Sequence, residues 1–248
     1  MAAQAMAMES RWEWMTACDV QQRFMQRQAA PAGALDHDAR CRQMLEVGGD
    51  CFDFIPLAGN RTGIAIGDAS GKGLAAALMI SSVQSSLRTA ALFGGDPAAV
   101  MDVVNRQVHA ASPSERYATL FYGVYDAATR TLRYVNAGHV PPMVLRRDGS
   151  VECLWTGGAP VGMFDDSTYD EGAVRLAPGD LLIACSDGIT EAANDADEQW
   201  GANGVRRAAA ANRAKPAHAI VDAIFRAMDE FTAGDQTDDA TVLVFRAK

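Results

Sequence analysis

Short β-rich segments fill the middle of the sequence, and helical patterns occupy separate blocks on either side. ATLFYGVYD (118–126) and TLRYVNAG (131–138) are rich in aromatic and β-branched residues and are separated by a short polar loop, which predicts a β-hairpin. Further short strands are expected at 142–146, 151–155, 173–176, 181–185 and 241–246, and helices at 73–92, 97–110, 203–212 and 216–231. The Met and Leu residues of the helix at 73–92 are expected in the core, and the helix at 216–231 carries an apolar stripe of Ile220, Ile224, Phe225, Met228 and Phe231. Hairpin-linked strands with helices in separate blocks predict an α+β fold with antiparallel sheets.

A further helix is predicted over residues 9–28, with Trp12, Thr16, Val20 and Phe24 on one stripe at i+4 spacing. A helix of this kind buries its stripe either on its own domain or on a partner copy, and the sequence leaves both alternatives open. We therefore divide the chain into residues 1–28, a linker, switch or dimerisation helix, and residues 29–248, a single domain.

Composition narrows the classes of partner and compartment. The formal net charge of −9 makes nucleic acid an unexpected partner, because phosphate-backbone binding requires a basic face. The sequence contains no run of 18 apolar residues, so no membrane span is predicted. The first residues lack the basic start and apolar block of a secretory signal. The five cysteines are scattered without a CxxC pair, which indicates reduced thiols. These features favour a cytoplasmic protein.

Four acidic clusters lie at predicted strand ends or in tight turns. They are Val47–Asp53, Gly67–Gly73, Ser186–Gly188 and Asp238–Thr241. Three of them place Asp beside glycine, which lets a turn present a carboxylate and a main-chain carbonyl to one point. Mg²⁺ and Mn²⁺ prefer such oxygen ligands, whereas zinc favours His and Cys. Each cluster alone also has a plain explanation, since Asp-Gly is a common turn dipeptide and Asp238-Asp239 fits a charged loop.

Two other phosphate chemistries are excluded by spacing. The segment Gly67–Gly73 has three residues between its first glycine and Gly71-Lys72, whereas a P-loop has four and continues with Ser or Thr. No cysteine is followed six residues later by an arginine that would hold phosphate in a cysteine phosphatase. Lys72 could add charge near helix N-terminal amides for a phosphate, or be a solvated first-turn lysine. For His139 a structural role in a loop is favoured over a catalytic one.

The order of the motifs adds a resemblance to these observations. VGGDCFDF, GDASGKG, NAGH, PVGM, PGD, SDGITEA and DDATV resemble, in sequence and spacing, the bacterial SpoIIE/RsbU-like branch of the PPM (2C-type) protein phosphatases. The resemblance runs from about Gln21 to Phe245. It implies a four-layer αββα sandwich, in which two antiparallel sheets lie between helices and a two-metal centre lies at one edge.

The resemblance also implies site residues and a cofactor. Asp50 and Asp68 match the central metal aspartates, and the Ala69 carbonyl would be a further ligand of Mn²⁺ or Mg²⁺, with two or more ions bound. Asp187 and Asp238 would complete the second metal, with Asp239 as the alternative to Asp238. Ser70 and Lys72 stand where eukaryotic relatives have a histidine, and we assign them to phosphate binding. The phosphate-binding arginine that eukaryotic relatives carry near the N-terminus has no clear counterpart.

The function that follows is metal-dependent hydrolysis of phosphoserine or phosphothreonine on a partner protein. The resemblance implies a STAS-type anti-anti-sigma factor or a similar bacterial signalling protein as the substrate. A water activated by the cations would attack the phosphate directly, without a covalent phosphoenzyme. The alternative is a catalytically weak relative that serves as a binding or regulatory module.

Overall fold

The predicted hairpin lies at the centre of a sheet in the computed structural model, which describes residues 2–25, 36–113 and 115–247. The strand order is β2-β3-β4-β5-β8, and β9 also pairs with β5. All pairings are antiparallel except that of β5 with β8. The strands are β2 (Asp50–Leu57), β3 (Arg61–Ala69), β4 (Ala118–Asp126), β5 (Thr131–Ala137), β8 (Gly157–Gly158) and β9 (Gly172–Arg175).

The second sheet joins the two ends of the domain. Its order is β1-β11-β10-β6-β7, with antiparallel pairing throughout, so the last strand of the chain lies between β1 and β10. The strands are β1 (Asp36–Arg42), β6 (Met143–Leu145), β7 (Val151–Cys153), β10 (Leu181–Cys185) and β11 (Ala240–Arg246). Every residue of β10 is buried, as expected for a strand covered on both faces.

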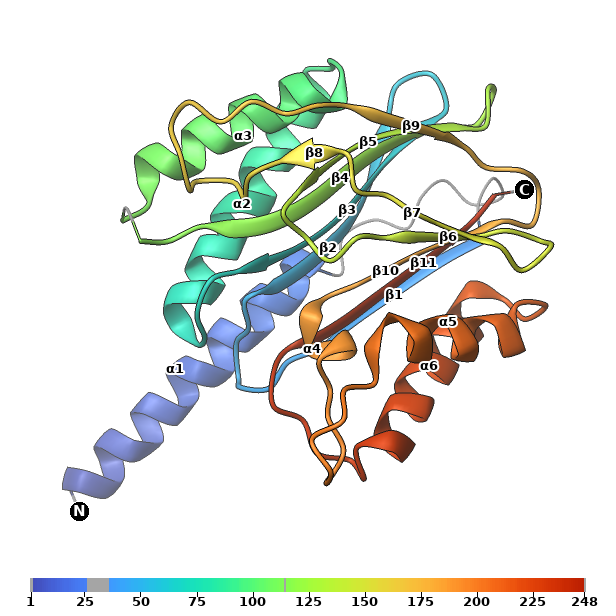
Figure 1. Cartoon of the computed structure of the whole chain (residues 1–248). Coiled ribbons are helices and arrows are strands. Elements are labelled where there is room, and N and C mark those ends of the chain that lie inside the picture. The colour runs from blue at the N-terminus through green and yellow to red at the C-terminus, as the bar shows by residue number, and fades with distance from the viewer. Residues whose placement is uncertain (1, 26–35, 114, 248) are drawn as a thin grey trace.

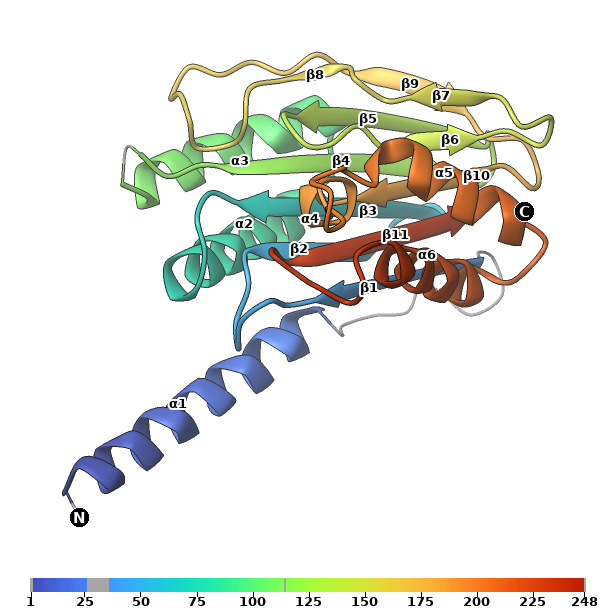
Figure 2. The ribbon, with the colours of Figure 1, turned by 60° about the horizontal axis from the view of Figure 1, so that its bottom comes forward.

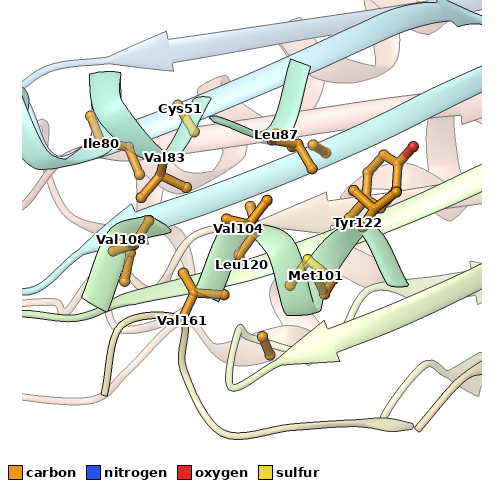
Figure 3. Close-up of a cluster of buried hydrophobic side chains, with 14 of the residues drawn as sticks. Cys51, Ile80, Val83, Leu87, Met101, Val104, Val108, Leu120, Tyr122 and Val161 are labelled. Atoms are coloured by element: carbon orange, nitrogen blue, oxygen red, sulfur yellow. The ribbon is translucent and has the colours of Figure 1, made fainter. Parts of the chain in front are cut away.

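Helices cover the outer face of each sheet (Figures 1 and 2). On the first sheet lie α2 (Leu74–Leu92) and α3 (Pro97–Ala111), and on the second α5 (Gly201–Asn212) and α6 (Ala217–Phe231). Apolar clusters fill all three interfaces: one under α2 and α3, shown in Figure 3, one under α5 and α6, and one between the sheets. The α+β class and the four-layer αββα arrangement are therefore confirmed.

Amphipathic spacing explains α6 well, but it overstates the burial of α2. The predicted α6 stripe is buried from Ile220 to Met228. On α2, Met79 and Leu87 are buried, whereas Leu74, Leu78 and Leu92 are exposed. The prediction that all Met and Leu residues of this helix are core is wrong for these three leucines. The apolar residues of α2 are distributed around the whole helix. Only one side of the helix faces the sheet and α3, so the leucines on the other sides are exposed.

The N-terminal helix α1 (Ala2–Met25) begins earlier than predicted, and residues 26–28 lie outside the described residues. Its N-terminal end points away from the sandwich (Figures 1 and 2). Trp12 is 68% exposed and Val20 49%, so burial of the stripe on the chain's own domain is wrong for these two residues. Gln21 is buried instead, because its side chain donates to the Gly48 carbonyl at 2.7 Å and accepts from the Gly48 N–H at 3.1 Å.

All five cysteines are free thiols, as predicted. None of the described helices combines the length and apolar character that a membrane span needs.

Candidate metal centre

The four acidic clusters meet at one edge of the sandwich. Asp50 is the first residue of β2 and lies directly across the ladder from Asp68, near the end of β3. From the other sheet, Asp187 opens the one-turn helix α4 (Asp187–Thr190) after β10, and Asp238 precedes β11. The Ser186 N–H donates to the Thr241 carbonyl at 3.0 Å, which holds the last two segments together.

Asp50 forms the buried part of this edge, with only 1% of its surface exposed. One of its carboxylate oxygens accepts hydrogen bonds from the hydroxyls of Ser186 (2.7 Å) and Thr241 (2.6 Å), both from the opposite sheet. Burial, and then the charge of Asp68, raise the pKa of Asp50 well above its usual value. The two hydroxyls orient the carboxylate and join the two sheets at this point.

Asp68 lies among like charges. Burial, and then the carboxylates of Asp187, Asp238 and Asp239, raise its pKa to about 7. The pKa of Asp187 is also raised, first by burial and then by Asp238. Mutual repulsion of this kind shows that carboxylates from three separate segments face a common region.

Asp238 and Asp239 have different partners, which bears on the alternative that the sequence left open. The two Asp239 oxygens accept the backbone N–H groups of Met44 and Gly49, each at 2.7 Å, so this side chain fixes the loop before Asp50. Asp238 instead pairs with Lys72 at 2.8 Å. Because a cation could replace the lysine ammonium but not two backbone amides, the geometry favours Asp238 over Asp239 as the ligand.

Gly49 explains how the Ala69 carbonyl comes close to the carboxylates. A Cβ atom on Gly49 would lie 3.1 Å from the Ala69 oxygen and 3.3 Å from one oxygen of Asp68. The Ala69 N–H also donates to the Gly49 carbonyl at 3.0 Å. A side chain at residue 49 would therefore push against both predicted ligands, which accounts for glycine in the VGGD segment.

The two residues predicted to bind phosphate, Ser70 and Lys72, contact other parts of the chain. The Ser70 hydroxyl accepts the Tyr117 N–H at 3.2 Å. The Lys72 ammonium contacts the Asp238 carboxylate and donates to the Thr237 carbonyl, both at 2.8 Å. Their part in phosphate binding stays a prediction.

His139 lies near the edge but is enclosed. Its backbone N–H donates to the Asn136 side chain at 2.8 Å, and its Nδ1 contacts the Thr119 hydroxyl at 3.0 Å. Burial lowers the pKa of His139 to about 4, so the ring is neutral at neutral pH. These contacts agree with the structural role that the sequence favoured.

The donor set fits a hydrated hard cation better than a fully enclosed one. Within the described ranges no three His, Cys, Asp or Glu side chains are close enough to form a ready-made metal cage. Mg²⁺ does not need one, since it keeps several waters and is held by one or two carboxylates. Separate carboxylates around a half-open region, with a backbone carbonyl beside them, match that preference.

Sequence reasoning missed Ser186 and Thr241, the hydroxyl partners of Asp50. Both stand inside the motifs that supplied the aspartates, Ser186 directly before Asp187 and Thr241 two residues after Asp239. A hydroxyl residue flanking a predicted ligand was the available signal, because ligating carboxylates are themselves held by hydrogen bonds.

Comparison with known proteins identifies the family. Residues 58–248 match the family model described as Stage II sporulation protein E (SpoIIE). The chain belongs to the SpoIIE family. The phosphoserine phosphatase RsbU of Bacillus subtilis is 29% identical, over 74% of this chain and 55% of RsbU. The chain spans only 35% to 55% of the length of the first curated relatives it matches.

Solved structures show the same fold. The SiaA-PP2C domain of Pseudomonas aeruginosa has a TM-score of 0.84 at 22% identity, and the match covers 100% of both chains. RsbX, whose crystal structure is in complex with magnesium, has a TM-score of 0.66 at 15% identity, covering 89% of this chain and 99% of RsbX. Together with the SpoIIE family match and the similarity to RsbU, this shared fold confirms the SpoIIE/RsbU-like branch of the PPM (2C-type) family predicted from the motif order.

Proposed function

We propose that this SpoIIE-family chain is a metal-dependent protein phosphatase that hydrolyses phosphoserine or phosphothreonine on a partner protein. The observation that carries the proposal is the meeting of Asp50, Asp68, Asp187 and Asp238, from four separate segments, at one edge of the sandwich. Phosphoserine is the favoured substrate because RsbU, the relative with 29% identity, is a phosphoserine phosphatase.

We assign the four aspartates and the Ala69 carbonyl as ligands of two or more Mn²⁺ or Mg²⁺ ions. When bound, such ions supply Lewis-acid activation of water and neutralise phosphate charge. Asp50 is oriented for this task by Ser186 and Thr241. Asp68 pairs with Asp50 across the ladder and also feels the charges of Asp187 and Asp238, so we assign it as the ligand nearest to the shared centre.

The partner and the domain division are part of the same proposal. Family resemblance favours a STAS-type signalling protein as the substrate. We propose residues 29–248 as the phosphatase domain and residues 1–28 as a linker or switch helix. The exposed Trp12 and Val20 on α1 make this helix the surface through which a homodimer would form.

The test is hydrolysis of p-nitrophenyl phosphate and of a phosphoserine peptide, with Mn²⁺ or with EDTA. We expect turnover only with the metal. Asp68→Ala should lower kcat/KM by more than about 100-fold, since even the outer partners of metal ligands cost 10- to 100-fold when removed. Asp195→Ala is the matched control, because Asp195 is exposed and lies outside the four clusters.

Turnover that survives chelation would exclude the metal-dependent mechanism. Near-native kcat/KM in Asp68→Ala would exclude the assignment of this ligand while leaving the metal requirement to stand.

A further inference from the structure

Several cationic side chains of the described residues are already paired with carboxylates. Lys72 contacts Asp238 at 2.8 Å, Arg42 contacts Asp229 at 2.6 Å, and Arg88 contacts Asp53. A lysine or arginine paired in this way has little charge left for a substrate phosphate. A lysine or arginine near the edge with the four aspartates that has no carboxylate partner keeps its charge for a substrate phosphate.

Arg116 is such a cation. It lies in the loop between α3 and β4, and it takes part in no ion pair among the described residues. One nitrogen of its guanidinium, Nη1, donates a hydrogen bond to the Ser70 carbonyl at 2.9 Å. The side chain is half-buried.

The register of β3 and β4 fixes Arg116 beside the predicted ligands. Asp68 pairs with Thr119 and Ala69 with Ala118 across the ladder. The ladder continues outward, because the Ser70 N–H donates to the Tyr117 carbonyl at 2.9 Å. The Ser70 carbonyl that binds Arg116 thus follows the Ala69 carbonyl by one residue and Asp68 by two.

Gly71 leaves the space that the guanidinium occupies. It has φ +91°, and a Cβ atom at this residue would lie 2.5 Å from the Arg116 Nη1. Any other residue at 71 would be strained and would displace the guanidinium from the loop. The GDASGKG loop and Arg116 therefore form one local unit, although they are 46 residues apart at the Ser70 contact.

A guanidinium held by one nitrogen keeps most of its capacity for binding. Arg has five N–H donors in a rigid fork that matches two phosphate oxygens, and phosphate hydrogen bonds to such a charged donor are among the stronger ones in proteins. We propose that Arg116 binds the non-bridging oxygens of the substrate phosphoryl group. This inference rests on the proposed phosphatase function and assigns the phosphate contact that the sequence left without an arginine.

The experiment compares Arg116→Ala and Arg116→Lys with the wild type at saturating Mn²⁺. With p-nitrophenyl phosphate, Arg116→Ala should raise KM and the inhibition constant of inorganic phosphate by about 10-fold or more, as expected for a lost charged hydrogen bond. Arg116→Lys keeps the charge without the fork, so both constants should lie between those of the wild type and Arg116→Ala. The Mn²⁺-induced rise in melting temperature should not change.

Arg106→Ala is the matched control, since Arg106 is exposed on the preceding helix α3 and should leave both constants unchanged. Wild-type KM and phosphate inhibition in Arg116→Ala would overturn the proposal. A defect limited to a phosphoprotein, with p-nitrophenyl phosphate unaffected, would also overturn it, because Arg116 would then contact the partner protein and not the phosphate.

Calorimetric binding of inorganic phosphate to the Mn²⁺-loaded protein separates this inference from the proposed function. If the wild type turns over no substrate, the phosphatase proposal fails, yet weaker phosphate binding in Arg116→Ala would still support the Arg116 assignment and equal binding would reject it. If Arg116→Ala does not fold, Arg116→Lys decides by the same two measurements.

Discussion

The edge of the sandwich that carries the four aspartates has a buried inner half and a more exposed outer half. The carboxylates of the two halves have opposite kinds of neighbour. In the inner half, Asp50 is buried and accepts two hydroxyl hydrogen bonds from Ser186 and Thr241. In the outer half, Asp68 and Asp187 are partly exposed, and burial and then neighbouring carboxylates raise the pKa of each: Asp187, Asp238 and Asp239 act on Asp68, and Asp238 acts on Asp187. Protein donors thus hold the inner carboxylate in place, whereas the outer carboxylates repel one another until a cation arrives.

This difference predicts how the metal-free protein responds to Mn²⁺ and pH. At about 100 times the dissociation constant, Mn²⁺ should stabilise the fold by about 2.7 kcal/mol. Because the folded-state pKa of Asp68 is about 7, against 3.8 ordinarily, the folded state holds an extra proton between these pH values. The free energy of unfolding of the metal-free protein should therefore fall as pH rises through that window.

Thermal melts with and without Mn²⁺, at about pH 5 and about pH 8, measure both effects. The Mn²⁺ response should be larger at the higher pH, because protons no longer compete for Asp68. Asp187→Asn should reduce this response, and Asp195→Asn, at an exposed position, should not. Equal responses at both pH values would show that the outer carboxylates do not bind the ion.

The inner half should be sensitive to a single hydroxyl. Thr241→Val removes the 2.6 Å hydrogen bond to the buried Asp50 carboxylate at nearly constant volume. We expect a loss of about 1–3 kcal/mol in the free energy of unfolding, because a buried acceptor is left with fewer donors. The affinity for Mn²⁺ should fall by about 10- to 100-fold, as for other residues that orient metal ligands.

Denaturant unfolding and Mn²⁺ titration of Thr241→Val would measure these losses. The matched control is Thr232→Val, because Thr232 is also buried but its hydroxyl has no hydrogen-bond partner within the described residues. That change should be neutral or stabilising and leave Mn²⁺ affinity unaffected. If both variants behave alike, the Asp50 hydrogen bonds do not organise the site.

The same contrast explains what could be predicted from the sequence. Asp50, Asp68 and Asp187 stand beside glycine in short motifs, and the order of all the motifs, through the family resemblance, indicated that they belong together with Asp238. The β-hairpin and the α6 stripe follow from local periodicity, and these were confirmed. Local patterns cannot show which side of α2 faces solvent, since Leu78 and Met79 are adjacent and equally apolar.

Contacts between distant segments were also beyond the sequence. Ser186 and Thr241 reach Asp50 across 136 and 191 residues, and only the stacking of the two sheets brings them together. Gln21 gave no signal because a polar residue on a helix normally faces water, yet it is buried against Gly48.

The smallest expected effect concerns Lys72, which balances the outer half. Its ammonium pairs with Asp238, and both side chains are about half-exposed, so the pair contributes no more than about 1 kcal/mol to stability.

If Lys72 serves as the counterion of Asp238 in the metal-free state, Lys72→Met should slightly destabilise the metal-free protein. It should also raise Mn²⁺ affinity a few-fold, because the cation no longer displaces an ammonium, and leave KM for p-nitrophenyl phosphate unchanged. If Lys72 binds phosphate, as the sequence pattern suggested, KM should rise and Mn²⁺ affinity should stay the same. Lys72→Arg, which keeps the charge, is the control, and steady-state kinetics with Mn²⁺ titration would distinguish the two roles.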